Sequence, residues 1–421
     1  MKVAIHSLGC KVNIYESEYV ISLLKKNNYQ IVDFSSFSDI YIINTCSVTN
    51  ESDRKSRKAI SQARKNNPNA IIIVMGCYSQ LKADEIEADI IIGNKDKSKI
   101  IELINEYQAK KEKVKKIYDL KHTTFENMEI DKFINHTRAF VKIQDGCNAF
   151  CSYCIIPYTR GNIRSKNKED VINEIKKLVD NGYQEIVLTG IHTGKYGIDL
   201  NTNLETLLKE LVKIKGLYRL RLSSIEINEI TEGIIKLIKE NNIMAKHLHI
   251  PLQSGSDKIL KLMNRHYDTK YFYEKIKKIR EEIPDISITT DLIVGFPYET
   301  EECFAETIDL LKKIKFSHIH TFPYSKRDGT KASLMPQIDG NIKKKRVKEV
   351  LEISNYYESE FYKQSINKIY DGVSEVKEDK TIIHTTNFIP VIIPNKISNN
   401  KIVNIKITKV DNLKVYGKEL I

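Results

Sequence analysis

The sequence contains no long apolar run. A membrane-spanning helix needs roughly 18 to 20 consecutive apolar residues, and no segment of the 421 residues approaches that length. The N-terminal stretch MKVAIHSLGCKVN also lacks the apolar run and the small-residue cleavage site of a signal peptide. These absences predict a soluble, cytoplasmic protein without a membrane partner.

Cysteine is scarce, with seven residues in the whole chain. Disulfide frameworks are rare in the reducing cytosol, where cysteines more often serve as metal ligands or catalytic thiols. The low and odd count therefore argues against a disulfide scaffold. It makes each group of cysteines a candidate for ligand chemistry.

Acidic residues are outnumbered by basic ones, which gives a net charge of +12 and a pI near 9.0. Such an excess favours a partner covered in phosphates, because Lys and Arg that neutralise phosphates release counterions. An AT-rich genome that enriches lysine codons would produce the same excess. The charge alone leaves both interpretations open.

Short apolar runs alternate with amphipathic stretches over the first hundred residues. The runs KVAIHSL, IYIINTCSV and AIIIVMGC are separated by helical patterns such as ESDRKSRKAISQARKNN. This alternation predicts an α/β fold in which helices cover a parallel sheet.

Three cysteines, Cys10, Cys46 and Cys77, each follow the end of a strand predicted in this region. The carboxyl ends of parallel strands share one edge of a sheet, where ligands bind. A single cysteine there is often a small core residue, but three in the same position predict a shared metal centre. Their spacing is too wide for a local zinc knuckle, so this prediction depends on the strand assignment.

The charged segment 116–135 has no sustained apolar period, which is typical of a linker. We therefore predict an N-terminal domain over 1–115, a linker over 116–135, a central domain over 136–366 and a C-terminal domain over 367–421.

The central domain repeats a longer strand and helix pattern six times. The predicted strands include RAFVKIQ, EIVLTGIH and SHIHTFPYS, and helical patterns such as LETLLKELVKI lie between them. Six such units predict an open (β/α)6 partial TIM barrel, whose active site would lie at the carboxyl ends of the strands. The helix that closes the unit carries a basic run over 343–346, which is either a solvated first turn or a phosphate contact.

The C-terminal segment 367–421 consists of short alternating stretches such as FIPVIIP and KIVNIKITKV, spaced by Asn, Asp and Gly. This pattern predicts a small β-barrel. Its lysine excess is compatible with RNA binding but does not establish it.

Three further cysteines, Cys147, Cys151 and Cys154, lie within eight residues, CNAFCSYC. Four ligands close a structural metal site, whereas three leave a position free for chemistry. Cysteine thiolates at such short spacings are typical ligands of iron–sulfur clusters. Zinc is the alternative and would need His136 as its fourth ligand, while Cys303 on a predicted helix is expected to pack in the core.

The C-x3-C-x2-C spacing with an aromatic residue, Tyr153, before the last cysteine resembles the signature of radical S-adenosylmethionine enzymes. Together with LGCKVNIYESE, NTCSVT and GCYSQ, the surrounding VKIQDGCNAFCSYCIIPYTRGNIRS resembles the methylthiotransferases of that superfamily over nearly the whole chain. The resemblance implies two 4Fe–4S clusters. It implies that Cys147, Cys151 and Cys154 hold the catalytic cluster, and Cys10, Cys46 and Cys77 the second one.

The branches of this family differ in short motifs. GCKVN and TGIHTGKYG are similar to the branch that acts on N6-threonylcarbamoyladenosine beside the tRNA anticodon. The branch acting on isopentenyladenosine usually has GCQMN, and the branch modifying a ribosomal protein aspartate usually has GCPKN. The resemblance therefore implies a tRNA substrate, and the other two branches stay as alternatives, as does a metal-dependent RNA-binding protein without catalysis.

The implied reaction inserts a methylthio group at C2 of adenine, an aromatic C–H position that has no acidic proton. One S-adenosylmethionine would methylate a sulfur held at the N-terminal cluster. A second would be reductively cleaved at the catalytic cluster to a radical. The cofactors then carry the hard chemistry, and the protein needs a sulfur donor and an electron donor of the flavodoxin or ferredoxin type.

Contacts to S-adenosylmethionine are expected from residues at or after the predicted strand ends, namely Thr189, Gly190, Glu226, Gln253 and Gly295. Each also has a structural interpretation. Gly295 and Pro297 could simply turn a strand into a helix capped by Thr300, and Glu226 could be a carboxylate facing water.

Arg160 and Arg164 in YTRGNIRS are candidates for phosphate or carboxylate contacts, or for salt bridges. The C-terminal barrel resembles the TRAM module of the family, which implies a contact with the anticodon stem-loop of tRNA.

Overall fold

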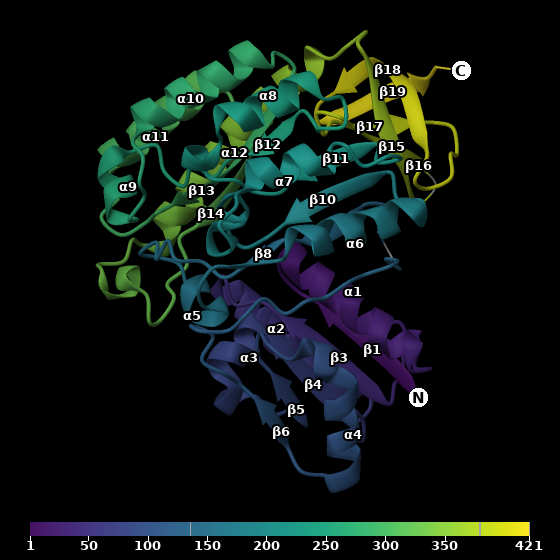
Figure 1. Cartoon of the computed structure of the whole chain (residues 1–421). Coiled ribbons are helices and arrows are strands. Elements are labelled where there is room, and N and C mark those ends of the chain that lie inside the picture. Colours follow the sequence, from purple (N-terminus) through teal and green to yellow (C-terminus); the bar gives the residue numbers. More distant parts are fainter. Residues whose placement is uncertain (135, 379, 421) are drawn as a thin grey trace.

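The computed structural model describes residues 1–134, 136–378 and 380–420. Figure 1 shows three regions along the chain: an N-terminal sheet with its helices, a larger central α/β region and a small all-β region at the C-terminus. The predicted mixed α/β fold is confirmed. No helix within these residues is both long enough and apolar enough to cross a membrane.

The N-terminal region is a six-stranded parallel sheet with the order β2-β1-β3-β4-β5-β6. The chain reverses direction across the sheet between β1 and β3, which is a topological switch point. The strands are β1 (Lys2–Ser7), β2 (Gln30–Val32), β3 (Ile40–Thr45), β4 (Ile71–Gly76), β5 (Ile90–Ile92) and β6 (Val114–Lys116).

Helices cover both faces of this sheet. One face packs against α1 (Lys11–Lys26) and α4 (Ile100–Lys110), and the other against α2 (Asn50–Asn66) and α3 (Cys77–Lys82). Successive residues of β3 alternate between the two cores, as the period of a strand requires. Short 3-10 turns, η1 (Ala83–Glu85) and η2 (Lys97–Lys99), complete the connections.

The central region contains six parallel strands in chain order. They form two three-stranded sheets, β11-β10-β7 and β12-β13-β14, joined by bridges between Leu220 and Met244 and between Ser224 and His249. The strands are β7 (Ala139–Lys142), β10 (Glu185–Thr189), β11 (Arg219–Leu222), β12 (His247–His249), β13 (Ser287–Val294) and β14 (His318–Pro323). The prediction of an open six-unit barrel is confirmed.

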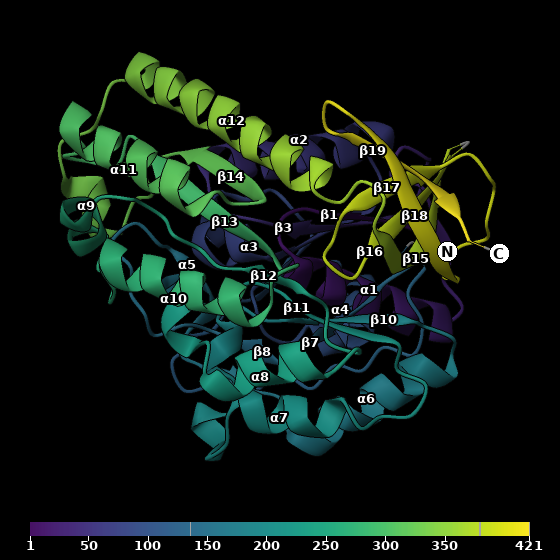
Figure 2. The ribbon, with the colours of Figure 1, turned by 90° about the horizontal axis from the view of Figure 1, so that it is seen from above.

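Helices form the outer layer of this partial barrel, as Figure 2 shows from above. They are α6 (Lys168–Asp180), α7 (Leu204–Leu211), α8 (Glu232–Glu240), α9 (Asp257–Leu262), α10 (Thr269–Glu282), α11 (Glu301–Ile314) and α12 (Gly340–Lys363). The loop after β7 contains the short pair β8 (Gln144–Asp145) and β9 (Arg164–Ser165) and the helix α5 (Ile156–Arg160). Further 3-10 turns are η3 (Thr193–Lys195), η4 (Ile198–Leu200), η5 (Ile227–Glu229) and η6 (Lys331–Leu334).

The C-terminal region is a closed five-stranded barrel with the order β15-β16-β17-β19-β18, which confirms the predicted small β-barrel. Its strands are β15 (Ile369–Lys377), β16 (Lys380–Thr385), β17 (Pro390–Ile393), β18 (Ile402–Asp411) and β19 (Lys414–Glu419). It lies against the amino-terminal ends of the central strands, where Arg219 forms an ion pair of 2.9 Å with Asp371.

The segment between the first two regions is packed. β6 adds an edge strand to the N-terminal sheet, and Met128, Ile130 and Phe133 are buried in the core of the central region. Tyr15 of α1 joins that core and donates a hydrogen bond of 2.6 Å to the carbonyl of Met128. Helix α1 therefore packs on both the sheet and the partial barrel.

Candidate metal centres

Cys10, Cys46 and Cys77 lie together at the carboxyl edge of the N-terminal sheet. They follow β1, β3 and β4, at the switch point where α/β sheets bind ligands. Cys10 and Cys77 are both close enough to Cys46 to interact with it electrostatically. Gly9 has a φ of +102°, and a Cβ built there would lie 3.0 Å from the Sγ of Cys46, so the turn that carries Cys10 needs glycine.

The surroundings of Cys10 and Cys46 favour the neutral form of their thiols. Burial raises the pKa of Cys10, although Arg160 opposes the rise. Burial and the neighbouring Cys77 raise the pKa of Cys46 to about 11. Metal ligation requires thiolates and releases their protons, so bound irons would have to supply the charge that makes these cysteines anionic.

A buried ionic network lies directly beside this trio. Arg160 donates to Glu16 at 2.9 Å, to Asp145 at 3.1 Å and to Asn13 at 3.0 Å. Asn13 in turn accepts a contact of 3.6 Å from the Sγ of Cys10. Arg160 and Glu16 are both fully buried.

Cations outnumber anions in this network. Lys97, Lys142 and Arg164 also reach its two carboxylates, at 2.9, 3.0 and 3.2 Å. With Arg160 this makes four buried cations that pair with Glu16 and Asp145, while Glu126 acts on Lys97 and Lys142 electrostatically without an ion pair. Buried charges need compensation, and the nearby Cys77 already interacts electrostatically with Arg160. The excess positive charge therefore fits a group made anionic by thiolate ligands.

Cys147, Cys151 and Cys154 lie on the loop after β7 and β8, at the carboxyl rim of the partial barrel. Burial and the neighbouring Cys151 raise the pKa of Cys154 to about 12. Gly146 has a φ of +73°, and a Cβ there would lie 1.9 Å from the carbonyl oxygen of Asn162. Only glycine can start this loop without moving the opposite backbone.

Two charged pairs hold the side chains of this second trio. His192 Nδ1 lies 3.4 Å from the Sγ of Cys147, and its Nε2 lies 2.7 Å from Glu229. Arg265 donates to the Sγ of Cys151 at 3.4 Å and also pairs with Glu226. These residues line a cavity of about 400 Å³ beside Cys151.

The residues predicted to contact S-adenosylmethionine occupy different surroundings. Thr189 ends β10 and is buried, and the backbone of Gly190 packs against Gln144. Glu226 lines the cavity beside Cys151. Gln253 has a φ of 66° and forms a bridge to β13.

Gly295 lies in a turn that the structure explains without a ligand. Its N–H donates to Glu299 at 2.6 Å, and a Cβ there would meet the side chain of Lys343 at 2.4 Å. Arg346 pairs with Glu299 at 2.6 Å, so the basic run contributes a buried salt bridge. Thr300 caps α11 as predicted.

Four other residues discussed from the sequence can be assigned from their contacts. Arg160 and Arg164 are buried in salt bridges, which favours that interpretation over phosphate contacts. Cys303 is buried and packs in an apolar cluster, as expected. His136 lies before β7 near Glu18, at the opposite end of that strand from Cys147, so the zinc alternative lacks its fourth ligand.

The two trios fit iron–sulfur clusters by their donor chemistry, because each offers three cysteine thiols, the usual protein ligands of such clusters. Among residues 1–134, 136–378 and 380–420, no group of three or more His, Cys, Asp or Glu side chains is arranged to hold a metal ion, so the assignment of the trios depends on the donor chemistry of their thiols.

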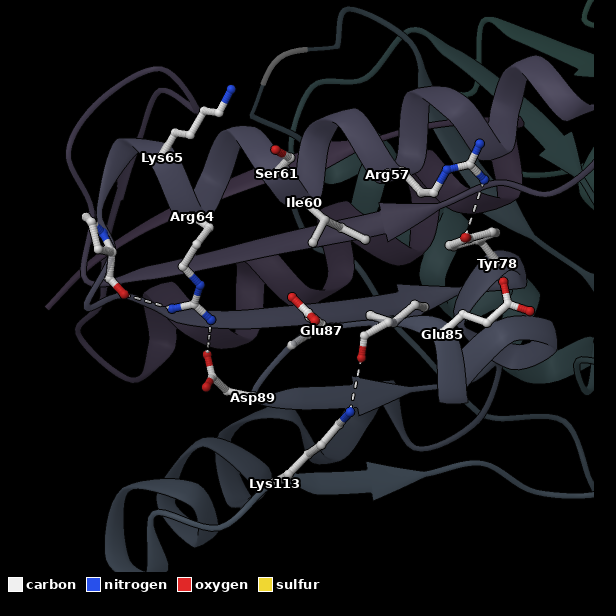
Figure 3. Close-up of a pocket in the computed structure, with 13 residues that line it drawn as sticks. Arg57, Ile60, Ser61, Arg64, Lys65, Tyr78, Glu85, Glu87, Asp89 and Lys113 are labelled. Carbon is white, nitrogen blue, oxygen red and sulfur yellow. Dashed lines mark hydrogen bonds and ion pairs between the residues drawn. The ribbon is translucent and has the colours of Figure 1, made fainter.

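A larger cavity, of about 860 Å³, lies elsewhere. Figure 3 shows its charged lining on the N-terminal region, where Arg64 bonds to Asp89 at 3.0 Å and Arg57 reaches Tyr78. Its wall runs from Pro68 and Asp89, which precede β4 and β5, to Tyr78, which follows Cys77. It therefore extends along the face of the sheet that α2 covers. None of the six candidate ligand cysteines lines this cavity, and it is not part of the candidate centres.

Several residues of the centres were not predicted from the sequence. The ionic network needs Glu16, Asp145, Lys97 and Lys142, and the second trio needs His192 and Arg265. The sequence could have indicated Glu16, because Asn13 and Glu16 are three residues apart and therefore lie on one face of the predicted helix. The others depend on contacts between distant segments.

Comparisons with known proteins agree with this arrangement. Residues 141–311 match the Radical SAM superfamily, and residues 2–93 match the uncharacterized protein family UPF0004. The chain is 42% identical to the threonylcarbamoyladenosine tRNA methylthiotransferase MtaB of Bacillus subtilis, over 97% of this chain and 94% of that protein. It is 41% identical to MtaB of Aquifex aeolicus, over 87% of this chain and 91% of the relative.

A relative with a different named substrate is more distant. The tRNA-2-methylthio-N(6)-dimethylallyladenosine synthase of Clostridium botulinum is 37% identical over 99% of this chain and 96% of its own length. Among solved structures, the radical S-adenosylmethionine methyltransferase TsrM of Kitasatospora setae, with cobalamin and a [4Fe-4S] cluster bound, has a TM-score of 0.58 at 13% identity. That match covers 79% of this chain and 77% of TsrM, and it shows a shared fold.

Proposed function

The chain belongs to the radical S-adenosylmethionine methylthiotransferase family, and we propose that it adds a methylthio group to C2 of N6-threonylcarbamoyladenosine beside the tRNA anticodon. The observation that carries this proposal is the similarity, along almost the whole chain, to relatives named for this nucleoside. The enzyme is thus a tRNA methylthiotransferase.

The family uses S-adenosylmethionine and 4Fe–4S clusters, and we assign thiols for two clusters in this chain. Cys10, Cys46 and Cys77 would hold the auxiliary cluster, with Arg160 and its network balancing its charge. When bound, the second cluster and S-adenosylmethionine supply a radical able to attack an adenine C–H that no side-chain base could deprotonate.

Cys147, Cys151 and Cys154 would hold that second cluster. Three protein ligands leave one position for a cofactor. His192, which is paired with Glu229, would keep Cys147 oriented toward the rim. Arg265, which is paired with Glu226, would do the same for Cys151. Thr189, Gly190, Glu226 and Gln253 are proposed to contact S-adenosylmethionine from the strand ends, and Gly295 is retained as a candidate through its backbone only.

The chain's own contribution is to fix the two trios relative to each other. The network joins α1, which follows Cys10, to β7 and β8, which precede Cys147. Its members are almost fully buried, so the connection is rigid and resists water. A radical made at one trio and a sulfur held at the other need such a fixed separation.

The substrate partner would be the anticodon stem-loop of tRNA, attracted by the positive net charge. We further propose a cytoplasmic protein that takes electrons from a flavodoxin or ferredoxin type donor and sulfur from a separate donor. The C-terminal barrel is proposed to contact RNA. The division at 1–115, 116–135, 136–366 and 367–421 stays a prediction.

The second candidate substrate is isopentenyladenosine, favoured by the similarity to the dimethylallyladenosine enzyme of Clostridium botulinum. Anaerobically reconstituted enzyme with S-adenosylmethionine, sulfide and a reductant would be incubated with stem-loop RNAs carrying either nucleoside. A methylthio mass increment on threonylcarbamoyladenosine alone supports the proposal. An increment on isopentenyladenosine alone transfers it to the second candidate, and an increment on neither RNA contradicts both.

The cysteine assignment has its own test in the same preparation. Replacing Cys10, Cys46 and Cys77 by alanine should halve the iron content and abolish methylthiolation, while deoxyadenosine release continues. Replacing Cys147, Cys151 and Cys154 should halve the iron and abolish both reactions. Unchanged iron content in either triple variant would contradict the assignment, and ribosome incubation with protein mass spectrometry tests the ribosomal alternative.

A further inference from the structure

A third cavity, of about 290 Å³, lies where the three regions of the chain meet. Its wall includes Lys11 from the start of α1, His249 from β12, His320 from β14 and Phe388 from the turn between β16 and β17. The cavity therefore opens between the auxiliary cysteine edge, the inner face of the partial barrel and the C-terminal barrel.

Lys11 directly follows Cys10, and its side chain is exposed in this cavity. Within the part of the chain that the structure describes, no carboxylate forms an ion pair with its ammonium group. The carboxylate of Asp291 acts on it electrostatically, but Asp291 is paired with His249 at 3.2 Å. Lys11 is therefore a cation that has no ion-pair partner among the described residues.

The surroundings of Lys11 add positive charge. Arg138 and Arg221 both act on it electrostatically, and their guanidinium groups lie 5.2 and 4.6 Å from the ring centre of Phe388. Arg221 is paired with Glu185 at 2.7 Å, whereas no ion pair of Arg138 occurs among the described residues. The region next to the cavity can therefore attract an anion.

The cavity also contains buried polar atoms that lack partners. The Nδ1 atoms of His247 and His384 have no hydrogen-bond partner, and both side chains line the cavity. Their rings lie 5.0 and 5.6 Å from the ring of Phe388. Buried polar atoms are normally satisfied, so these two point to a ligand that brings its own donors or acceptors.

From this arrangement we propose that Lys11 binds the carboxylate of the threonylcarbamoyl group and thereby selects this nucleoside. The inference rests on the proposed function. The threonylcarbamoyl substituent ends in a carboxylate, whereas a dimethylallyl substituent is a hydrocarbon that gains nothing from a cation.

The position along the chain supports the same assignment. Lys11 is one residue from a proposed ligand of the auxiliary cluster, and consecutive Cα atoms are about 3.8 Å apart. C2 and C6, the carbon that carries the N6 substituent, belong to the same six-membered ring of adenine. A base placed with C2 near the sulfur at Cys10 would therefore present its substituent to the same wall.

Another lysine near a cysteine trio is less suitable for this role. Lys195 lies in the cavity beside Cys151, 3.7 Å from Glu229. That glutamate would repel a substrate carboxylate. Lys11 faces no such acid at ion-pair distance among the described residues.

The test measures RNA binding rather than turnover. Cluster-loaded wild type, Lys11→Gln, Lys11→Arg and the control Lys25→Gln would be titrated with fluorescent anticodon stem-loops. Lys25 is exposed at the other end of the same helix, so its variant makes the same charge change away from the cavity. Three RNAs would carry threonylcarbamoyladenosine, its carboxamide analogue or unmodified adenosine, and iron content and circular dichroism would check each protein.

We expect wild type to bind the carboxylate RNA about 10- to 100-fold more tightly than the carboxamide RNA, the ratio typical of a hydrogen bond to a charged group. Lys11→Gln should lose this ratio, whereas Lys11→Arg should keep most of it and Lys25→Gln all of it. A ratio that persists in Lys11→Gln overturns the inference.

Two results for wild type separate this inference from the proposed function. If wild type prefers threonylcarbamoyladenosine to adenosine but treats the carboxylate and carboxamide alike, the role of Lys11 is wrong and the function stands. If wild type does not distinguish threonylcarbamoyladenosine from adenosine, the substrate assignment itself is contradicted.

Discussion

Removing the charge of Glu16 should destabilise the protein severely without leaving a cavity. Glu16 accepts from Lys97 at 2.9 Å, Lys142 at 3.0 Å and Arg160 at 2.9 Å, and all four side chains are almost fully buried. Glu16→Gln keeps the size of the side chain. It leaves the buried cations of the network with Asp145 as their remaining carboxylate.

The magnitude follows from the cost of an uncompensated buried charge. Breaking a buried ion pair by removing one partner costs about 3–5 kcal/mol. Lys142 and Arg160 keep Asp145 as an ion-pair partner, whereas Lys97 keeps a hydrogen bond of 3.1 Å to Asn94 and a longer-range electrostatic interaction with Glu126. We therefore expect Glu16→Gln to lower the free energy of unfolding by about 3–5 kcal/mol at pH 7.

The pH dependence gives a second criterion. Burial alone would raise the pKa of Glu16. The pKa nevertheless lies well below its usual range, because the positive charges of Arg160, Lys97 and Lys142 stabilise the carboxylate. A carboxyl whose folded pKa is depressed stabilises the protein above its unfolded value of about 4.3, and this contribution is lost as the pH falls toward the folded value. The difference between wild type and Glu16→Gln should be full at neutral pH and shrink below about pH 4.

Urea unfolding followed by circular dichroism at several pH values measures both effects. Glu112→Gln is the matched control, because Glu112 is exposed and surface changes usually stay within about 0.5 kcal/mol. If Glu16→Gln lowers the free energy of unfolding by less than about 1 kcal/mol at pH 7, the reasoning that Glu16 compensates buried cations is wrong.

Three further outcomes follow from the fold and its charge. Gly146→Ala should cost about 1–3 kcal/mol and lower the iron content, because its φ of +73° and the carbonyl of Asn162 leave no room for a Cβ; an iron content equal to that of wild type would contradict the geometry of the loop. Asp371→Asn should loosen the C-terminal barrel by weakening its pair with Arg219, which limited proteolysis detects as faster cleavage between the two regions, and unchanged cleavage would speak against this role. Binding of tRNA should weaken steeply as salt rises, since phosphate contacts release counterions; a flat salt dependence in a filter-binding titration would exclude the basic surface as the main contact.

The fold was largely predictable because its signals are local. Apolar runs such as AIIIVMGC and KIVNIKITKV mark strands directly, and their alternation with helical patterns indicates parallel sheets. The grouping of Cys10, Cys46 and Cys77 followed from topology, because strand ends of a parallel sheet share an edge. The structure brings these three residues together at that edge.

The segment 116–135 shows what composition conceals. Its charged residues suggested a linker, yet Met128, Ile130 and Phe133 are buried in the central core. Three apolar residues at irregular intervals carry no period, so pattern analysis could not assign them. Their burial depends on α1, which lies about a hundred residues earlier in the chain, and on α6, which begins at Lys168.

The charged residues of the centres were the hardest to interpret. Arg160 was a candidate either for a phosphate or carboxylate contact or for a salt bridge, and the structure places it in a buried network with Glu16 and Asp145. Burial of a charge cannot be read from its neighbours in the chain, because the compensating groups come from other elements. The same reason hid the roles of His192 and Arg265 beside the second trio.

The most direct test of the central claim is nucleoside mass spectrometry of tRNA from a host that lacks these methylthio modifications, with and without this gene. We expect a methylthio increment on threonylcarbamoyladenosine only when the gene is present. An unchanged threonylcarbamoyladenosine in cells with active iron–sulfur assembly would contradict it.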